Sequence, residues 1–236
     1  MTRKLWIPIA AAIALALLGG GGAYVYFFSG LRTAPPALAL ASPSATSTAT
    51  TGGPGTWTVA SGSVAGYRVT EQFAGQSSTH QAVARTSAVS GQVTIVQSGD
   101  TYQMSSATIT VQLSNLASVD AVAGYNVTNR DRIVQESLDV GTFPTAVFEA
   151  KNVALPAGAE ADQAVTVSAP GKLTIHGVTK DVTARLQLRV SGGSAQIAGS
   201  ISSNMTDFGI SPPRAPFVTV QPPVTIEVSL NLSKSA

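Results

Sequence analysis

The chain has 236 residues, no cysteine, and only 11% charged residues. The lack of cysteine excludes disulfides, a thiol nucleophile and Cys-ligated zinc. Before Thr56 the charged residues are Arg3, Lys4 and Arg32, whereas from Thr56 onward 11 Lys and Arg stand against 12 Asp and Glu, a net charge of −1. This near-neutral region has no basic run, which argues against a nucleic-acid partner.

The N-terminal segment has the pattern of a membrane-spanning helix. Residues 5–28 carry no charge, and as a helix these 24 residues extend about 36 Å, enough to cross a hydrocarbon core of about 30 Å. Arg3 and Lys4 precede this run and are expected to stay on the cytoplasmic side, with the rest of the chain outside. We therefore expect residues 1–31 to form a cytoplasmic tip and a transmembrane anchor.

A cleaved signal peptide is the other interpretation of this segment. The small residues 21–23 suit a signal peptidase, whereas the aromatic cluster at 24–28 favours a retained anchor at the far membrane interface. Both interpretations export the domain that follows. The expected localisation is the cell membrane, single-pass with an extracytoplasmic C-terminal domain, and the alternative is secretion after cleavage.

The next segment, residues 32–55, is rich in Ser, Thr, Ala, Pro and Gly. Such a composition cannot bury a hydrophobic core. We expect a disordered linker that works as a flexible spacer between the membrane and the domain.

Residues 56–236 have the pattern of a series of consecutive β-strands. Apolar and polar residues alternate with a period of two, most strictly from Val182 to Val190, and a hairpin is expected around Ser98–Asp100. About eight to ten antiparallel strands are typical of a closed barrel, which leaves no exposed edge. The expected fold is all-β, an eight-stranded antiparallel barrel, and a barrel of this size is either filled by side chains or holds one small ligand.

One segment departs from the strand pattern. Ile133, Val134 and Leu138 have helical spacing, with Asn and Thr residues before them that suit a helix cap. Arg130 and Asp131 stand at the start of this helix. They are interpreted either as a solvated helix start or as residues that pin the helix over the barrel mouth.

His176 is the residue on which a catalytic interpretation depends, because the chain has only two histidines. It follows a predicted strand and precedes Gly177, whose backbone freedom suits a turn. The second histidine, His80, is not placed at any metal-binding spacing relative to it, and no Gly-x-Ser-x-Gly motif is present. We interpret His176 as a turn residue of a hairpin, and we expect no catalytic residue, no metal and no cofactor.

Four motifs in chain order carry a resemblance to a known family. They are TWTV with SGSVAGYRV, NRDR followed by LDVGTFPTAVFEA, GKLTIHGVTKDVTARLQL, and TDFGISPP with VTIEVSLNL. Together they resemble the YceI-like family of polyisoprenoid-binding, lipocalin-like barrels over nearly all of residues 56–232. Where the family usually has histidines, this chain has Glu71 and Ile133.

The resemblance implies an eight-stranded antiparallel barrel with a helix as a lid and a long apolar pocket for an isoprenoid chain. The partner implied is therefore an isoprenoid or quinone lipid, with the membrane as a second partner through the N-terminal helix. Alternation and the family match together predict the ligand-binding residues, which are Tyr67, Val69, Ile109, Arg130, Asp131, Phe143, Phe148, Ile175, Leu186 and Leu188.

Two other classes of function remain open at this point. A filled barrel would make the domain a surface interaction module, and a small cavity volume would favour it. An enzyme acting on a lipid is the other class, favoured by a buried Ser–His or Glu–His contact or by a strongly shifted Glu71 pKa.

Overall fold

The structure is a computed structural model that describes residues 32–42, 52–75, 78–122, 127–159, 163–215 and 217–235. The expected anchor at residues 5–28 lies outside these ranges. Among the described residues, no helix combines the length and the apolar character needed to cross a bilayer.

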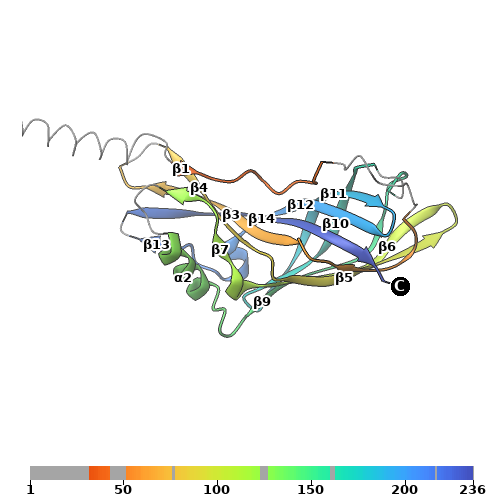
Figure 1. Cartoon of the computed structure of the whole chain (residues 1–236). Coiled ribbons are helices and arrows are strands. Elements are labelled where there is room, and N and C mark those ends of the chain that lie inside the picture. The colour runs from red at the N-terminus through yellow and green to blue at the C-terminus, as the bar shows by residue number, and fades with distance from the viewer. Residues whose placement is uncertain are drawn as a thin grey trace, which may run out of the picture.

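A closed antiparallel barrel of eight strands forms the body of the molecule (Figure 1), which confirms the expected fold. Two of these eight strands are interrupted and consist of two segments each. One is made of β2 and β3, which both pair with β14. The other is made of β4, which pairs with β3, and β5, which pairs with β2. The ring closes where β12 pairs with β14. The barrel strands are β2 (Gly55–Val59), β3 (Val64–Phe73), β4 (Thr79–Thr86), β5 (Val89–Ser98), β6 (Thr101–Gln112), β9 (Thr145–Ala154), β10 (Val165–Ile175), β11 (Val178–Ser191), β12 (Ser194–Asn204) and β14 (Val218–Lys234).

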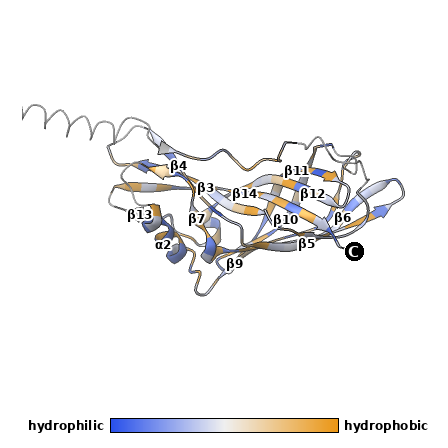
Figure 2. Ribbon diagram, viewed as in Figure 1, coloured by the Kyte–Doolittle hydropathy of each residue, from blue (hydrophilic) through white to orange (hydrophobic). Residues whose placement is uncertain are grey.

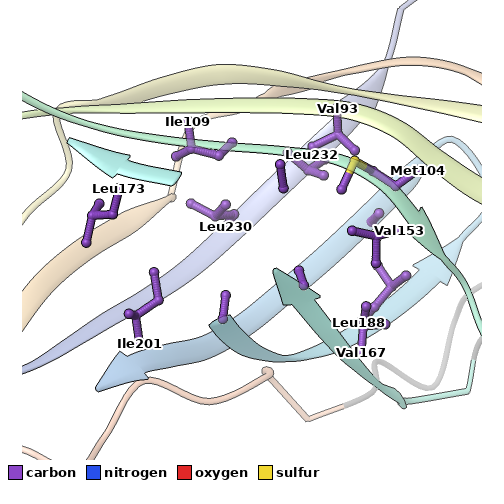
Figure 3. Close-up of a cluster of buried hydrophobic side chains, with 14 of the residues drawn as sticks. Val93, Met104, Ile109, Val153, Val167, Leu173, Leu188, Ile201, Leu230 and Leu232 are labelled. Carbon is purple, nitrogen blue, oxygen red and sulfur yellow. The ribbon is translucent and has the colours of Figure 1, made fainter. Parts of the chain in front are cut away.

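The period-two alternation of the sequence sets the two faces of the barrel wall. Successive side chains of a strand point to opposite faces, and Figure 2 shows hydrophobic and hydrophilic residues alternating along the strands. Figure 3 shows Ile109, Leu173, Leu230 and Met104, which come from the barrel strands β6, β10 and β14, pointing into the same interior. The buried core therefore lies inside the barrel.

Two strand glycines permit close contact between neighbouring strands. A Cβ atom on Gly199 would lie 2.1 Å from the carbonyl oxygen of Arg185, and one on Gly91 would lie 2.1 Å from that of Thr108. Any side chain at these positions would push the strands apart, so glycine is required by packing there.

The short elements gather at one end of the barrel (Figure 1). Helix α2 (Val127–Ser137) is the predicted helix, and it contacts the two-residue strand β7 (Ala117–Ser118), which pairs with β4. Two further short strands, β8 (Ala121–Val122) and β13 (Arg214–Ala215), and the 3-10 helices η1 (Leu113–Asn115) and η2 (Met205–Phe208) complete the set. We call this end, defined by α2, β7 and β8, the helix end.

The hairpin between β10 and β11 confirms the interpretation of His176 as a turn residue. Its backbone φ is 53°, and Gly177 follows with a φ of 72°. The imidazole packs edge-on against Phe143, with ring centroids 5.1 Å apart, and Nδ1 lies 3.2 Å from the carbonyl oxygen of Phe208.

Residues 32–42 differ from the expected flexible linker. Strand β1 (Arg32–Thr33) pairs with β8, and the chain then runs along the outside of the barrel from the helix end towards β11 (Figure 1). Four hydrogen bonds tie this segment to the barrel: Arg68 to the Pro35 oxygen, Arg85 to the Pro36 oxygen, Leu38 N–H to Glu227, and Arg189 to the Ala41 oxygen. We call residues 32–42 the strap.

Candidate functional site

The barrel encloses an apolar cavity of about 320 Å³. Its lining runs from Trp57 on β2 to Ile133, Val134 and Leu138 at the inner side of α2. It therefore extends along the barrel interior and ends under the helix. The polar side chains among its lining are few: Tyr67, Tyr102, Glu71, Arg130, Ser137 and Ser200.

Most of the predicted ligand-binding residues line this cavity. The structure brings eight of them together around it: Tyr67, Val69, Ile109, Arg130, Phe148, Ile175, Leu186 and Leu188. Asp131 and Phe143 are not part of the lining. Asp131 instead accepts hydrogen bonds from Ser118, and Phe143 packs against the His176 hairpin.

Arg130 fastens the helix to the barrel through a buried ionic cluster. Its guanidinium donates to Glu71 Oε2 at 3.2 Å, to Asp120, and to the Ser118 hydroxyl at 2.9 Å. Asp131 accepts a hydrogen bond of 3.0 Å from the Ser118 backbone N–H. The two residues at the start of α2 therefore hold the helix over the cavity, which was one of the two sequence interpretations.

His80 and Asp120 extend the cluster, and sequence reasoning did not find them. Nε2 of His80 lies 2.7 Å from Asp120 Oδ2, while Asp120 Oδ1 accepts from the Val83 backbone N–H at 3.0 Å. His80 stands opposite Glu71 in the pairing of β3 with β4. Alternation along β3 predicts an inward Glu71, but no local pattern points to Asp120, which lies between two very short strands.

Burial and charge act against each other in this cluster. Burial raises the pKa of Glu71, and the opposing effects of Arg130 and His80 only partly offset it. Burial also acts to raise the pKa of Asp120, but hydrogen bonds from His80, Val83 and Arg130 hold it below its ordinary value. Burial likewise raises the pKa of the Tyr67 phenol, against the influence of Arg130. Asp120 is therefore the carboxylate that the fold keeps ionised, and Glu71 the one whose ionised form the fold disfavours.

No group of three or more His, Asp or Glu side chains suited to a metal ion occurs in the part of the chain that the structure describes. His80 faces Asp120 and His176 faces the Phe208 carbonyl, so each imidazole contacts a protein acceptor. The charged groups next to the cavity thus bind one another rather than converging on a common point inside it, whereas the buried indole N–H of Trp57, which lines the cavity, has no hydrogen-bond partner among the described residues.

A closed antiparallel barrel with an apolar internal cavity defines the class of small β-barrel binding folds. The model of the YceI-like domain family matches residues 57–232. The chain belongs to this family, as the four sequence motifs indicated.

One curated relative is similar to part of the chain. A UPF0312 protein of Pseudomonas fluorescens is 35% identical over 92 residues, a match that covers 36% of this chain and 46% of that protein. The chain thus spans about half the length of the curated relative that it matches.

Solved structures are similar to the barrel. A polyisoprenoid binding domain from Saccharophagus degradans, implicated in plant cell wall breakdown, has a TM-score of 0.54 and 12% identity, and the match covers 77% of this chain and 99% of that one. BcnA of Burkholderia cenocepacia has a TM-score of 0.47 and 18% identity, covering 70% of this chain and 95% of that one. At 12% identity, the first of these supports the barrel fold alone.

Proposed function

We propose that this protein is an extracytoplasmic carrier of an isoprenoid-type lipid, which it holds in the barrel cavity without catalysis. The observation that carries the proposal is the cavity of about 320 Å³ under α2, with a lining that is almost entirely apolar. Cavities from about 300 Å³ upward are the usual size for small-molecule sites. The polyisoprenoid binding domain of Saccharophagus degradans shares the fold, which supports the same ligand class here.

The apolar lining is sufficient to bind a prenyl chain. Each buried methylene contributes about 0.8 kcal/mol, so some fifteen buried carbons contribute roughly 12 kcal/mol. Association itself costs at least about 4 kcal/mol. The remainder is at most about 8 kcal/mol, which corresponds to a dissociation constant no tighter than about micromolar without any charged contact.

The charge of the cluster at the helix end favours a neutral head group. Arg130 is the cation of this cluster, and it faces the carboxylates of Glu71 and Asp120, with Asp131 beside it. Its charge is therefore already compensated, and a phosphate placed there would have to compete with these carboxylates for the guanidinium. We infer that a quinone or a prenol suits this end of the cavity better than a polyprenyl phosphate.

The two alternative functions fit the site less well. A filled barrel would leave no cavity, so the cavity volume argues against a pure surface interaction module. The raised pKa of Glu71 is the observation that favours an enzyme. However, the Glu71 carboxylate accepts from Arg130, and His80 contacts Asp120, so both groups have structural partners.

The proposal includes the location expected from the sequence. In this proposal residues 5–28 hold the chain in the cell membrane as a single span, and the barrel lies on the extracytoplasmic side. Such an anchor keeps a carrier beside its lipid source at high effective concentration.

The binding test uses the fluorescence of Trp57, which lines the cavity. The only other tryptophan is Trp6, so a Trp6→Phe background isolates the signal. The full chain in detergent micelles is titrated with a short-chain menaquinone, and saturable quenching of Trp57 is expected because the quinone enters the cavity. Polyprenyl phosphate is then added as a competitor, and we expect it to displace the quinone poorly.

Two neighbouring substitutions provide the control for this titration. Ala184 faces the cavity, whereas Thr183 is exposed on the outside of the same strand. Ala184→Phe places a ring in the ligand space and is expected to weaken binding at least about tenfold, equivalent to about 1.4 kcal/mol. Thr183→Phe is expected to bind as the parent does. Equal binding by both variants would overturn the cavity as the binding site.

A further inference from the structure

The strap determines where the N-terminal segment leaves the barrel. Arg32 pairs with Val122 and Thr33 with Ala121, at the helix end. From there the strap crosses the outside of neighbouring strands until Arg189 on β11 donates to the Ala41 oxygen at 2.7 Å. Arg32 therefore lies at the same end of the barrel as α2 and β7 (Figure 1).

A buried ionic cluster outside the barrel wall holds the strap. Glu227 points away from the cavity, yet it is only 2% exposed. Oε1 of Glu227 accepts from Arg85 at 2.8 Å, and Oε2 lies 3.5 Å from Arg68. Each arginine also donates to a proline carbonyl of the strap, and the Leu38 N–H donates to Glu227 at 3.3 Å. Because a buried carboxylate is costly without partners, this cluster favours the docked strap.

Docking shortens the link between the apolar N-terminal run and the barrel. Only three residues lie between Phe28 and Arg32, and four peptide steps span at most about 14 Å. Without docking, 26 residues would lie between Phe28 and Gly55, with a maximum reach of about 90 Å. The docked strap thus keeps the helix end close to the last residue of the apolar run and leaves little freedom for the barrel to turn over.

The helix end also presents exposed apolar side chains. Val119, between β7 and β8, is 46% exposed, and Phe217, next to the start of β14, is 48% exposed. Phe73, Val122 and Val218 form a small buried cluster at the same end, which joins β3, β8 and β14. Exposed apolar groups of this kind suit contact with a lipid surface.

We propose that the helix end of the barrel rests on the outer surface of the lipid bilayer, held there by the strap, so that lipid passes between bilayer and cavity past α2. This inference rests on the proposed membrane anchor. It deepens the proposed function, because a lipid that enters at the contact does not have to cross water as a free molecule.

The test compares two labelled positions at opposite ends of the barrel. The chain has no cysteine, so Val119→Cys and Val96→Cys each give a single labelling site. Both valines are exposed, at 46% and 37%, and Val96 belongs to the β5–β6 hairpin at the far end. The full-length protein carries a fluorophore at one of these sites. It is reconstituted in vesicles of phosphatidylethanolamine and phosphatidylglycerol that carry a head-group quencher. Strong quenching is expected at position 119 and weak quenching at position 96.

Two insertions of equal length test the role of the strap. A 20-residue Gly/Ser segment between Leu31 and Arg32 adds a flexible tether with an r.m.s. length of about 25 Å on the membrane side of the strap. The same segment between Ser42 and Pro43 lengthens the chain only after the strap. The first insertion is expected to remove most of the quenching at position 119, and the second to leave it unchanged.

The outcomes separate this inference from the proposal on which it rests. Equal quenching at the two positions, in protein that floats with the vesicles, overturns the orientation and leaves the anchor intact. An equal effect of the two insertions overturns the role of the strap. Protein that is recovered from its host without residues 5–28, or that does not float with the vesicles, overturns the anchor and this inference with it. The titration with menaquinone in micelles does not depend on the orientation, the strap or the anchor, so it tests the proposed lipid binding separately.

Discussion

Two buried ionic clusters lie on opposite sides of the same part of the barrel wall. Inside, Arg130 binds Glu71 and Asp120, and the three side chains are at most 8% exposed. Outside, Glu227 binds Arg68 and Arg85, whose side chains are 17% and 18% exposed. Each cluster attaches a segment that is not part of the barrel, which is α2 for the inner cluster and the strap for the outer one.

The clusters differ in how they hold the attached segment. The inner cluster uses side chains of α2, namely Arg130 and Asp131, so its attachment depends on residue type. The outer cluster binds the strap through the carbonyl oxygens of Pro35 and Pro36 and the N–H of Leu38. Backbone groups are present whatever the side chain is. A segment that looks like a featureless linker in the sequence can therefore still have a defined place on the barrel.

Removing the arginine of the inner cluster should have the largest effect. Arg130→Ala leaves Asp120 and Glu71 buried without their cation, and breaking a buried pair in this way costs about 3–5 kcal/mol of unfolding free energy. Urea denaturation measures the loss. Arg132 is the control on the same helix, because its side chain is 66% exposed, and Arg132→Ala should cost at most about 0.5 kcal/mol. Similar losses for both variants would show that the inner cluster does not hold the helix.

The outer cluster should respond more weakly, and it should release the strap. Glu227→Gln keeps the size of the side chain but removes its charge, so we expect a loss of about 1–3 kcal/mol. Hydrogen exchange at Leu38 should become faster as the strap detaches. Asp181 is the control, with a side chain 85% exposed and paired to Lys172, and Asp181→Asn should change stability by less than about 0.5 kcal/mol. Unchanged exchange at Leu38 would argue against Glu227 as the residue that holds the strap.

The smallest expected effect is on the pH dependence of stability, which tests the inner cluster through its two carboxylates. The folded state raises the pKa of Glu71 above its ordinary value of 4.5, so it binds a proton that the unfolded chain has already released. Stability should therefore rise as the pH falls from neutral towards 4.5, and Glu71→Gln should lose this rise. Asp120 acts in the opposite sense. Its pKa lies below 3.8 in the fold, so its contribution is complete above that pH and is lost only in stronger acid.

Thermal unfolding of the parent and of Glu71→Gln between neutral pH and pH 4.5 measures this difference. The two proteins differ only at residue 71, so the difference between their curves reports on the Glu71 side chain and its neighbours. Parallel curves for the two proteins would show that Glu71 is not the group responsible.

The residue pattern alone is enough to predict the barrel and most of its interior. Alternation assigns an inward face to Tyr67, Val69, Leu186 and Leu188, and these side chains line the cavity. It also indicated the helix and the His176–Gly177 turn, because helical spacing and glycine are local signals. The prediction of Phe143 as a pocket residue is wrong in its position, because this residue precedes β9, where the alternation of a strand does not apply.

The two ionic clusters, the path of the strap and the hollow interior depend instead on contacts between residues far apart in the sequence. Asp120 meets Arg130 because β7 pairs with β4 and brings the residues that follow it back beside that strand, and Glu227 meets Arg85 across 142 residues of sequence. The strap is bound through its backbone groups, which every residue has, so the residue types of the strap do not predict this binding. Whether a barrel of this size is filled or hollow depends on how its side chains pack against one another across the interior, and the period of a single strand carries no information about that.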